Sequence, residues 1–112
     1  MSPKELTREE RERIHSVKMY LLNHLDQQFT VEQLARRAAL GIQKFKDGFY
    51  TLFEMPVGAY IHEARMKQGR VLLRNSDKSI KEIAMLCGYS KARNFSSAYK
   101  KFFGVRPGEE RN

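Results

Sequence analysis

The sequence predicts an all-α fold in which two helix-turn-helix units are joined by a central linker helix. Three observations predict it: apolar residues recur at helical spacing, a helix-turn-helix pattern occurs twice, and basic residues exceed acidic ones. A chain of 112 residues is long enough to bury a core as a single domain. The expected parts are a polar, disordered lead-in over 1–6 and a domain over 7–112, with its first unit at about 7–53, the linker helix at about 56–74 and the second unit at about 79–111.

A capping box at Thr7 and Glu10 predicts a first helix that ends near Asp26, because such side chains satisfy backbone N–H groups that the first turn leaves unpaired. The residues expected on its buried stripe are Ile14, Val17, Leu21 and Leu25.

The first helix-turn-helix begins at a second capping box, formed by Thr30 and Gln33. Ala39 stands at the expected turn. Phe45 and Phe49 follow at the spacing of inward-facing core anchors, so the helix that carries them is expected to pack through its aromatic face.

Pro56 predicts the start of the linker helix, since proline in a first turn lacks an N–H that would have no partner there. The helix is expected over roughly Val57 to Arg74, followed by a polar turn at 75–78. Its expected buried residues are Ile61, Ala64, Val71 and Leu72.

The second helix-turn-helix opens with a third capping box, at Ser79 and Glu82. Gly88 supplies the left-handed conformation that ends a helix, and a new helix starts at about Ser90 or Lys91. The apolar residues expected to be buried are Ile80, Ile83, Ala84 and Cys87 in the first helix, and Phe95, Ala98, Tyr99, Phe102 and Phe103 in the second.

The two units repeat one pattern, which is stronger support than a single motif. Matching positions lie 49 residues apart up to the turn and 50 apart after it, so the second turn carries one extra residue. The matched pairs are Leu34 with Ile83, Ala35 with Ala84, Ala39 with Gly88, Phe45 with Phe95 and Phe49 with Tyr99. Ordinary capped helix hairpins are the simpler interpretation, which the repeat and the charge disfavour.

The charge balance points to a polyanionic partner. The chain has 21 Lys and Arg against 13 Asp and Glu, a formal net charge of +8 and a pI near 9.8. Cys87, the one cysteine, falls on an apolar helical stripe and predicts a core residue rather than a zinc ligand. No apolar run approaches the roughly 20 residues of a membrane helix, and no hydrophobic signal segment opens the chain. We therefore expect a cytoplasmic protein without membrane contact.

The sequence contains no pattern typical of an enzyme. His15, His24 and His62 are widely separated, and none has a metal-ligand spacing such as HExxH. No glycine-rich phosphate loop and no GxSxG motif occurs. We expect no catalytic residue, metal ion or cofactor.

The chain resembles the DNA-binding domain of the AraC/XylS family of transcription regulators over about Val31 to Arg111. The family's spacing of Ile, Ala, Gly, an aromatic, Phe, Tyr, Gly and Pro occurs in IKEIAMLCGYSKARNFSSAYKKFFGVRPGEER. Its connecting helix resembles ARMKQGRVLL, with Arg65 and Leu72-Leu73 in step. The resemblance implies seven helices, two homeodomain-like helix-turn-helix units on a rigid central helix, and sequence-specific binding of double-stranded DNA in transcription regulation.

The second helix of each unit is the expected recognition helix, because an α-helix fits the major groove and its face opposite the core anchors can read base edges. In the family, base contacts come from positions that match Gln43, Lys46, Asp47, Arg93 and Ser97, to which we add the outward-facing Asn94. Gln43 suits adenine and Arg93 suits guanine. The residues expected to contact phosphate are Lys44, Lys91, Ser96, Lys100 and Lys101.

Three residues depart from the family pattern. Asp47 and Ser97 stand where arginine is usual or frequent, and Gly41 replaces the usual capping serine. A carboxylate at position 47 repels phosphate, although it can accept a hydrogen bond from cytosine N4, so we expect weaker binding by the first unit.

We expect a monomer to cover two adjacent grooves, since a linker helix of about 18 residues spans roughly 27 Å against the ~34 Å between successive major grooves. The resemblance further implies RNA polymerase as a partner and a separate sensing or dimerising domain that precedes this part. A protein-docking module and a generic polyanion or RNA binder are the alternatives. RNA is disfavoured because the aromatic residues sit at core spacing, which leaves none evidently free to stack on bases.

Overall fold

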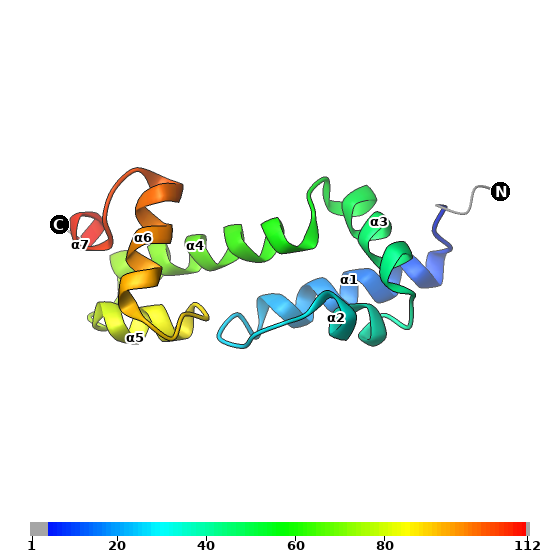
Figure 1. Ribbon diagram of the computed structural model, residues 1–112, viewed down its shortest axis with the longest axis horizontal. Helices are drawn as coiled ribbons and strands as arrows, with labels where there is room; N and C mark the ends of the chain where they lie inside the picture. The colour runs from blue at the N-terminus through cyan, green and yellow to red at the C-terminus, as the bar shows by residue number, and fades with distance from the viewer. Residues whose placement is uncertain (1–4, 112) are drawn as a thin grey trace. The chain divides into compact units, whose positions relative to one another are not determined.

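The computed structural model describes residues 5–111, which form seven α-helices and no strand, as the sequence and the family resemblance predict. The helices are α1 (Arg8–Leu22), α2 (Val31–Arg37), α3 (Ile42–Phe53), α4 (Val57–Asn75), α5 (Ile80–Leu86), α6 (Ala92–Phe103) and α7 (Pro107–Arg111) (Figure 1). The chain divides into two compact units. The first comprises the residues up to His24 and Gln28–Ile61, and the second comprises Leu25–Gln27 and the residues from His62.

The first unit packs α1, α2 and α3 around one apolar core. Phe45 and Phe49, the expected anchors of α3, are completely buried, and each contributes about 1.5–3 kcal/mol through removal from water. The residue between them, Gly48, has room for no side chain, because a Cβ there would stand 2.7 Å from Ile14 Cδ1. The buried members of this core are Leu6, Ile14, Val17, Leu21, Leu34, Ala35, Ala38, Phe45, Phe49 and Val57.

The last residue of the expected lead-in packs on the first core. Residues 1–4 of the predicted lead-in lie outside the described residues, but Leu6 is only 8% exposed and belongs to the first core. An added Cβ on Gly48 would lie 3.1 Å from Leu6 Cδ2, which places Leu6 over α3. An apolar residue directly before a helix cap can fold back on the core, and polarity of the surrounding segment hides this.

Helix α1 ends at Leu22 rather than near Asp26. The N–H of Asn23 donates to the carbonyls of Met19 and Tyr20, and its side-chain amide donates to Met19 O at 3.0 Å. These bonds satisfy the last carbonyls of the helix and end it. Leu25 is buried as predicted, but beyond the helix, because apolar spacing alone does not show whether a residue continues a helix.

All three predicted capping boxes are present. In each, the N-cap hydroxyl accepts from the N–H three residues later at 3.1 Å, and the Glu or Gln side chain accepts from the N-cap N–H in return. The three pairs are Thr7 with Glu10, Thr30 with Gln33 and Ser79 with Glu82.

The turns of the two units share a left-handed residue at the matched positions. Ala39 has φ of 55° and Gly88 has φ of 87°. Only glycine fits at position 88, since a Cβ there would stand 2.7 Å from the Leu25 carbonyl oxygen and 2.8 Å from the Arg65 guanidinium. That guanidinium donates to the carbonyls of Leu25 and Gln27. The repeat therefore extends from sequence to backbone conformation.

Helix α4 buries the face that we predicted only in part. Ile61 and Leu72 are half-buried against the first and second cores and Ala64 is half-buried, whereas Val71 is 57% exposed. The fully buried residues of α4 in the second unit are Met66, Gly69 and Leu73. Phe95 determines which face is buried, because its ring lies against Gly69. The spacing of apolar side chains could not predict this, because glycine has no side chain. The buried members of the second core are Met66, Leu73, Ile83, Ala84, Cys87, Phe95 and Tyr99.

The prediction that Phe102 is buried is wrong. Its side chain is 40% exposed, and its ring makes edge contacts with the rings of His62 and Phe103. Phe95, Tyr99 and Phe103 recur every four residues and form the inward stripe of α6, so Phe102 lies beside that stripe.

Helix α7 is fastened to the second unit through Glu110. The carboxylate accepts from Tyr99 Oη at 2.6 Å, Arg70 Nε at 2.9 Å and Arg74 Nη2 at 2.7 Å. The Tyr99 hydroxyl, followed by the two guanidinium groups, lowers the pKa of Glu110 to about 2. Arg111 Nε also donates to the Leu73 carbonyl at 3.2 Å. These bonds hold the last residues of α7 against α4 and α6.

Candidate nucleic-acid interface

The polar face of α3 begins in its first turn, directly after Gly41. Glycine provides no side-chain cap there, and the helix is held by its buried aromatic face. Gln43 and Lys46 are exposed on the opposite face, as predicted from the positions of Phe45 and Phe49. Both side chains therefore face solvent.

Gln43 and Asp47 are joined to each other. Gln43 Nε2 donates a hydrogen bond to Asp47 Oδ1 at 3.0 Å, as residues four apart on one helix face can do. Asp47 is half-buried, and its backbone carbonyl accepts from Thr51 Oγ1 at 2.9 Å. Two of the three residues expected to read bases in the first unit thus form a bonded pair.

Lys44 has a partner within the protein. Its ammonium Nζ lies 2.7 Å from Oε2 of Glu10, the same glutamate that closes the capping box of α1. The hydrogen bond from Lys44, followed by the one from the Thr7 backbone, lowers the pKa of Glu10. A phosphate at Lys44 would therefore compete with an existing ion pair.

The polar face of α6 carries side chains without internal partners. Arg93, Asn94 and Ser97 are exposed and Ser96 is half-buried. Within the part of the chain that the structure describes, none of these four side chains makes a hydrogen bond or an ion pair. Unlike the pair on α3, these donors and acceptors are free to meet a ligand.

Three exposed lysines flank this face. Lys91 is the N-cap residue of α6 and makes no capping bond, while Lys100 and Lys101 lie in the last turn. Cations in a last turn also stabilise a helix through its dipole, so the two C-terminal lysines have a structural use as well.

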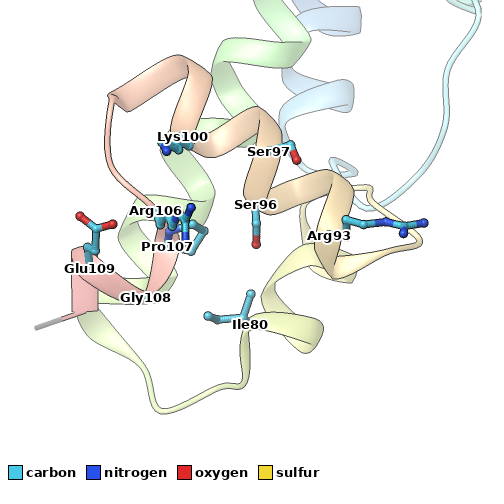
Figure 2. A pocket seen from close by; sticks show the side chains of 9 residues that line it. All are labelled: Ile80, Arg93, Ser96, Ser97, Lys100, Arg106, Pro107, Gly108 and Glu109. Carbon is cyan, nitrogen blue, oxygen red and sulfur yellow. The ribbon is translucent and has the colours of Figure 1, made fainter.

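A hollow lies beside α6, where α7 begins (Figure 2). Figure 2 shows Ser96 pointing into the space above Ile80, with Lys100 and Arg106 at the α7 side. Glu109 adds a negative charge at that side, while Arg93 extends from the other end of α6. The residues that line the hollow are Ile80, Arg93, Ser96, Ser97, Lys100, Arg106, Pro107, Gly108 and Glu109.

Arg106 is the residue that the sequence analysis missed. The sequence analysis assigned no functional role to the segment between α6 and α7 that contains Arg106. The only signal in the sequence is a basic residue directly before the proline that starts α7. Whether that residue joins the site depends on the fold, which brings Arg106 to the same hollow as Lys100.

The predicted site residues separate by unit. Gln43, Lys44, Lys46 and Asp47 lie on α3 in the first unit. The others lie on α6, or at its N-cap, in the second: Lys91, Arg93, Asn94, Ser96, Ser97, Lys100 and Lys101. Within each unit the structure brings the set together on one helix.

Residues 5–111 contain neither a candidate metal site nor a helix able to cross a membrane. No group of three or more His, Cys, Asp or Glu side chains there is placed to hold a metal ion. In the same range, every helix is too short or too polar to cross a membrane. Cys87 is buried, and burial raises the pKa of its thiol to about 12.

Comparison with known proteins identifies the arrangement. A family model described as a helix-turn-helix domain matches residues 34–112, most of the chain. The chain is 32% identical over 89 residues to the HTH-type transcriptional regulator ArgR of Pseudomonas aeruginosa. The chain belongs to the AraC-type helix-turn-helix family. This AraC-type chain is also 33% identical over 85 residues to the virulence regulon transcriptional activator VirF of Yersinia enterocolitica.

Two solved structures have the same fold. The DNA-binding domain of AdpA, solved in complex with a target DNA, has a TM-score of 0.83 and 29% identity, over 88% of this chain and 89% of that one. The C-terminal domain of AraT, a response regulator of Geobacillus stearothermophilus, has a TM-score of 0.82 and 25% identity, over 88% and 83%.

The AraC-type chain spans only part of its curated relatives. The match to ArgR covers 80% of this chain and 27% of the relative, and the match to VirF covers 76% and 31%. The likeness therefore concerns one domain of those proteins.

Proposed function

We propose that this AraC-type chain binds specific sequences of double-stranded DNA and thereby regulates transcription. The observation that carries the proposal is the exposed first turn of α6, where Arg93 and Asn94 have no side-chain partner among residues 5–111 while the opposite face is anchored in the core. The proposal is supported by the structural similarity to the DNA-binding domain of AdpA, which was solved in complex with a target DNA, and by the net charge of +8.

In this proposal Arg93 reads guanine and Gln43 reads adenine. A guanidinium offers parallel donors to guanine O6 and N7, and a side-chain amide offers one donor and one acceptor to adenine. Lys46, Asn94 and Ser97 lie on the same exposed faces and contribute the remaining contacts to bases.

The phosphate contacts in this proposal come mainly from cations of the second unit. Lys100 and Arg106 line one hollow and form a cationic site for a phosphate, and Lys91 and Lys101 are further exposed cations of that unit. Ser96 points into the same hollow and adds a hydroxyl donor. Lys44 contributes only after Glu10 is displaced.

We propose further that α3 and α6 enter successive major grooves of one duplex. Helix α4 is continuous over 19 residues, a length of about 28 Å against the ~34 Å between major grooves on one DNA face. A monomer would then protect about two helical turns of DNA. A footprint confined to one groove would contradict this part of the proposal.

Selection from a random duplex pool tests the function directly. The wild-type chain is expected to enrich one sequence, with affinity that falls steeply as salt rises because phosphate contacts release counterions. Duplex RNA of the same sequence is the control. Equal affinity for both duplexes, without enrichment of any sequence, would instead identify a generic polyanion binder.

We propose contact with RNA polymerase as a second activity. Both activities would take place in the cytoplasm. Val71 on α4 and Met85 on α5 are each 57% exposed, which suits contact with another protein. The name of VirF, which describes it as a transcriptional activator, supports activation. Val71→Asp is expected to lower transcription in a reconstituted system without lowering DNA affinity, and an unchanged transcript yield would exclude this surface.

A further inference from the structure

We propose that Asp47 is a positioning residue: it holds the side-chain amide of Gln43 in the orientation that reads adenine, and does not itself contact a base. This inference rests on the proposed DNA binding. It reassigns a residue that the sequence analysis placed among the base readers.

The hydrogen bond fixes which end of the Gln43 amide faces Asp47. A carboxylate only accepts hydrogen bonds, so the amide nitrogen must lie against Asp47 Oδ1, at 3.0 Å. Rotation of the amide by half a turn would set its oxygen against the carboxylate and lose the bond. Asp47 therefore removes one of the two orientations that a free glutamine side chain adopts.

The groups that remain on Gln43 match one base. After one amide hydrogen is given to Asp47, one N–H donor and the carbonyl acceptor are left. Adenine presents an acceptor at N7 and a donor at N6 in the major groove, whereas guanine presents two acceptors. An oriented amide therefore favours adenine, and guanine would leave the Gln43 oxygen facing an acceptor.

The second unit shows why position 47 needs a carboxylate and position 97 does not. Arg93 and Ser97 stand 50 residues after Gln43 and Asp47, at the same places on α6. In the described chain no hydrogen bond joins that second pair. A guanidinium presents only donors, so it needs no partner to choose between a donor and an acceptor end.

The burial of the pair agrees with these roles. Asp47 is half-buried and one of its oxygens already accepts from Gln43, while Gln43 is exposed. The negative charge of Asp47 would repel the phosphates of bound DNA. Orientation of the Gln43 amide is a role that would offset this repulsion.

Base preference in the variants tests the inference. Gln43→Ala first locates the base pair that Gln43 reads, by selection from a random duplex pool. Asp47→Ala is then expected to lower the adenine preference at that same base pair about tenfold, the scale of one lost bidentate contact. The double variant should show no further loss there, because both changes remove one interaction.

Two matched variants separate orientation from charge. Asp47→Asn removes the charge, but its amide can donate to the Gln43 oxygen as well as accept from the Gln43 nitrogen. Both orientations of Gln43 then return, so the adenine preference should fall as in Asp47→Ala while affinity rises for every sequence. Glu32→Ala removes an exposed negative charge from the same unit and leaves the Asp47 partner in place, so the adenine preference should stay intact. Circular dichroism and unfolding midpoints confirm that each variant is folded.

Two results would overturn this inference while leaving the proposed DNA binding intact. One is an Asp47→Ala chain that binds DNA with its adenine preference unchanged. The other is a loss of cytosine preference at a base pair different from the one that Gln43→Ala affects, which would make Asp47 a reader. A wild-type chain that enriches no sequence would overturn the proposed function as well, so the two failures are distinguishable.

Discussion

The ring of Phe95 occupies the space in which a side chain at position 69 would begin. A Cβ on Gly69 would stand 2.8 Å from Phe95 Cζ and 2.9 Å from Cε1. This contact joins the recognition helix α6 to the buried face of α4, so the second unit depends on a residue that has no side chain.

Gly69→Ala should therefore destabilise the protein, although alanine favours helices. Overpacking of a core costs about 1–3 kcal/mol, more than the helix propensity of about 1 kcal/mol that alanine gains over glycine. Gly58→Ala in the same helix is the control, because nothing lies within 4 Å of a Cβ there. Urea unfolding should show a lower midpoint for Gly69→Ala only, and equal stabilisation of both variants would contradict the contact.

The left-handed turn residues should respond in opposite directions. Ala39→Gly should stabilise the protein by about 0.5–1 kcal/mol, because the left-handed backbone strains alanine by more than glycine loses in chain entropy. Gly88→Ala should cost about 2 kcal/mol or more, since its Cβ would meet the Leu25 carbonyl at 2.7 Å. Thermal unfolding of both variants checks the pair, and a destabilised Ala39→Gly would refute the strain.

Acid should weaken the attachment of α7. The pKa of Glu110 is about 2 in the fold, below the ~4.3 of an unfolded glutamate, so its contribution is complete above the unfolded value. That contribution should decline as the pH falls from about 4 toward 2, where the folded carboxylate takes up its proton. Free energies of unfolding across this range should show a smaller pH dependence for Glu110→Gln, and identical curves would exclude the linkage.

Glu10 should restrain Lys44 from DNA. Glu10→Gln keeps an oxygen for the capping box but removes the ion pair, so the slope of log affinity against log salt should steepen by about 0.9, one phosphate contact. Glu82→Gln is the matched control, because Glu82 closes the capping box of α5 and forms no ion pair within the described residues. Equal slopes for the two variants would show that Lys44 contacts no phosphate.

Local signals in the sequence predicted the elements well. Each capping box spans only four residues of the chain, and a left-handed residue recurs at the turn of both units. These local features alone indicate where α2 and α5 begin and end. The anchors Phe45 and Phe95 were also predictable, because aromatic residues at helical spacing have few alternatives to burial.

The errors concern contacts between segments that are distant in sequence. The buried face of α4 was misassigned at Val71 because Phe95 selects the face that contains Gly69. In the candidate site, exposure of Gln43 and Arg93 followed from periodicity, whereas the ion pair of Lys44 with Glu10 depends on how α1 packs against α3. Periodicity along one helix contains no information about its partner.

The most direct measurement of the central claim compares Arg93→Ala with Lys100→Ala across a panel of duplexes that differ by single base pairs. Arg93→Ala should lose about 1–3 kcal/mol at one base pair and relax the preference there, while Lys100→Ala should weaken every duplex alike and lower the salt slope by about 1. If both variants lowered affinity equally for every duplex, α6 would not read sequence, and the account of a groove-reading helix would be wrong.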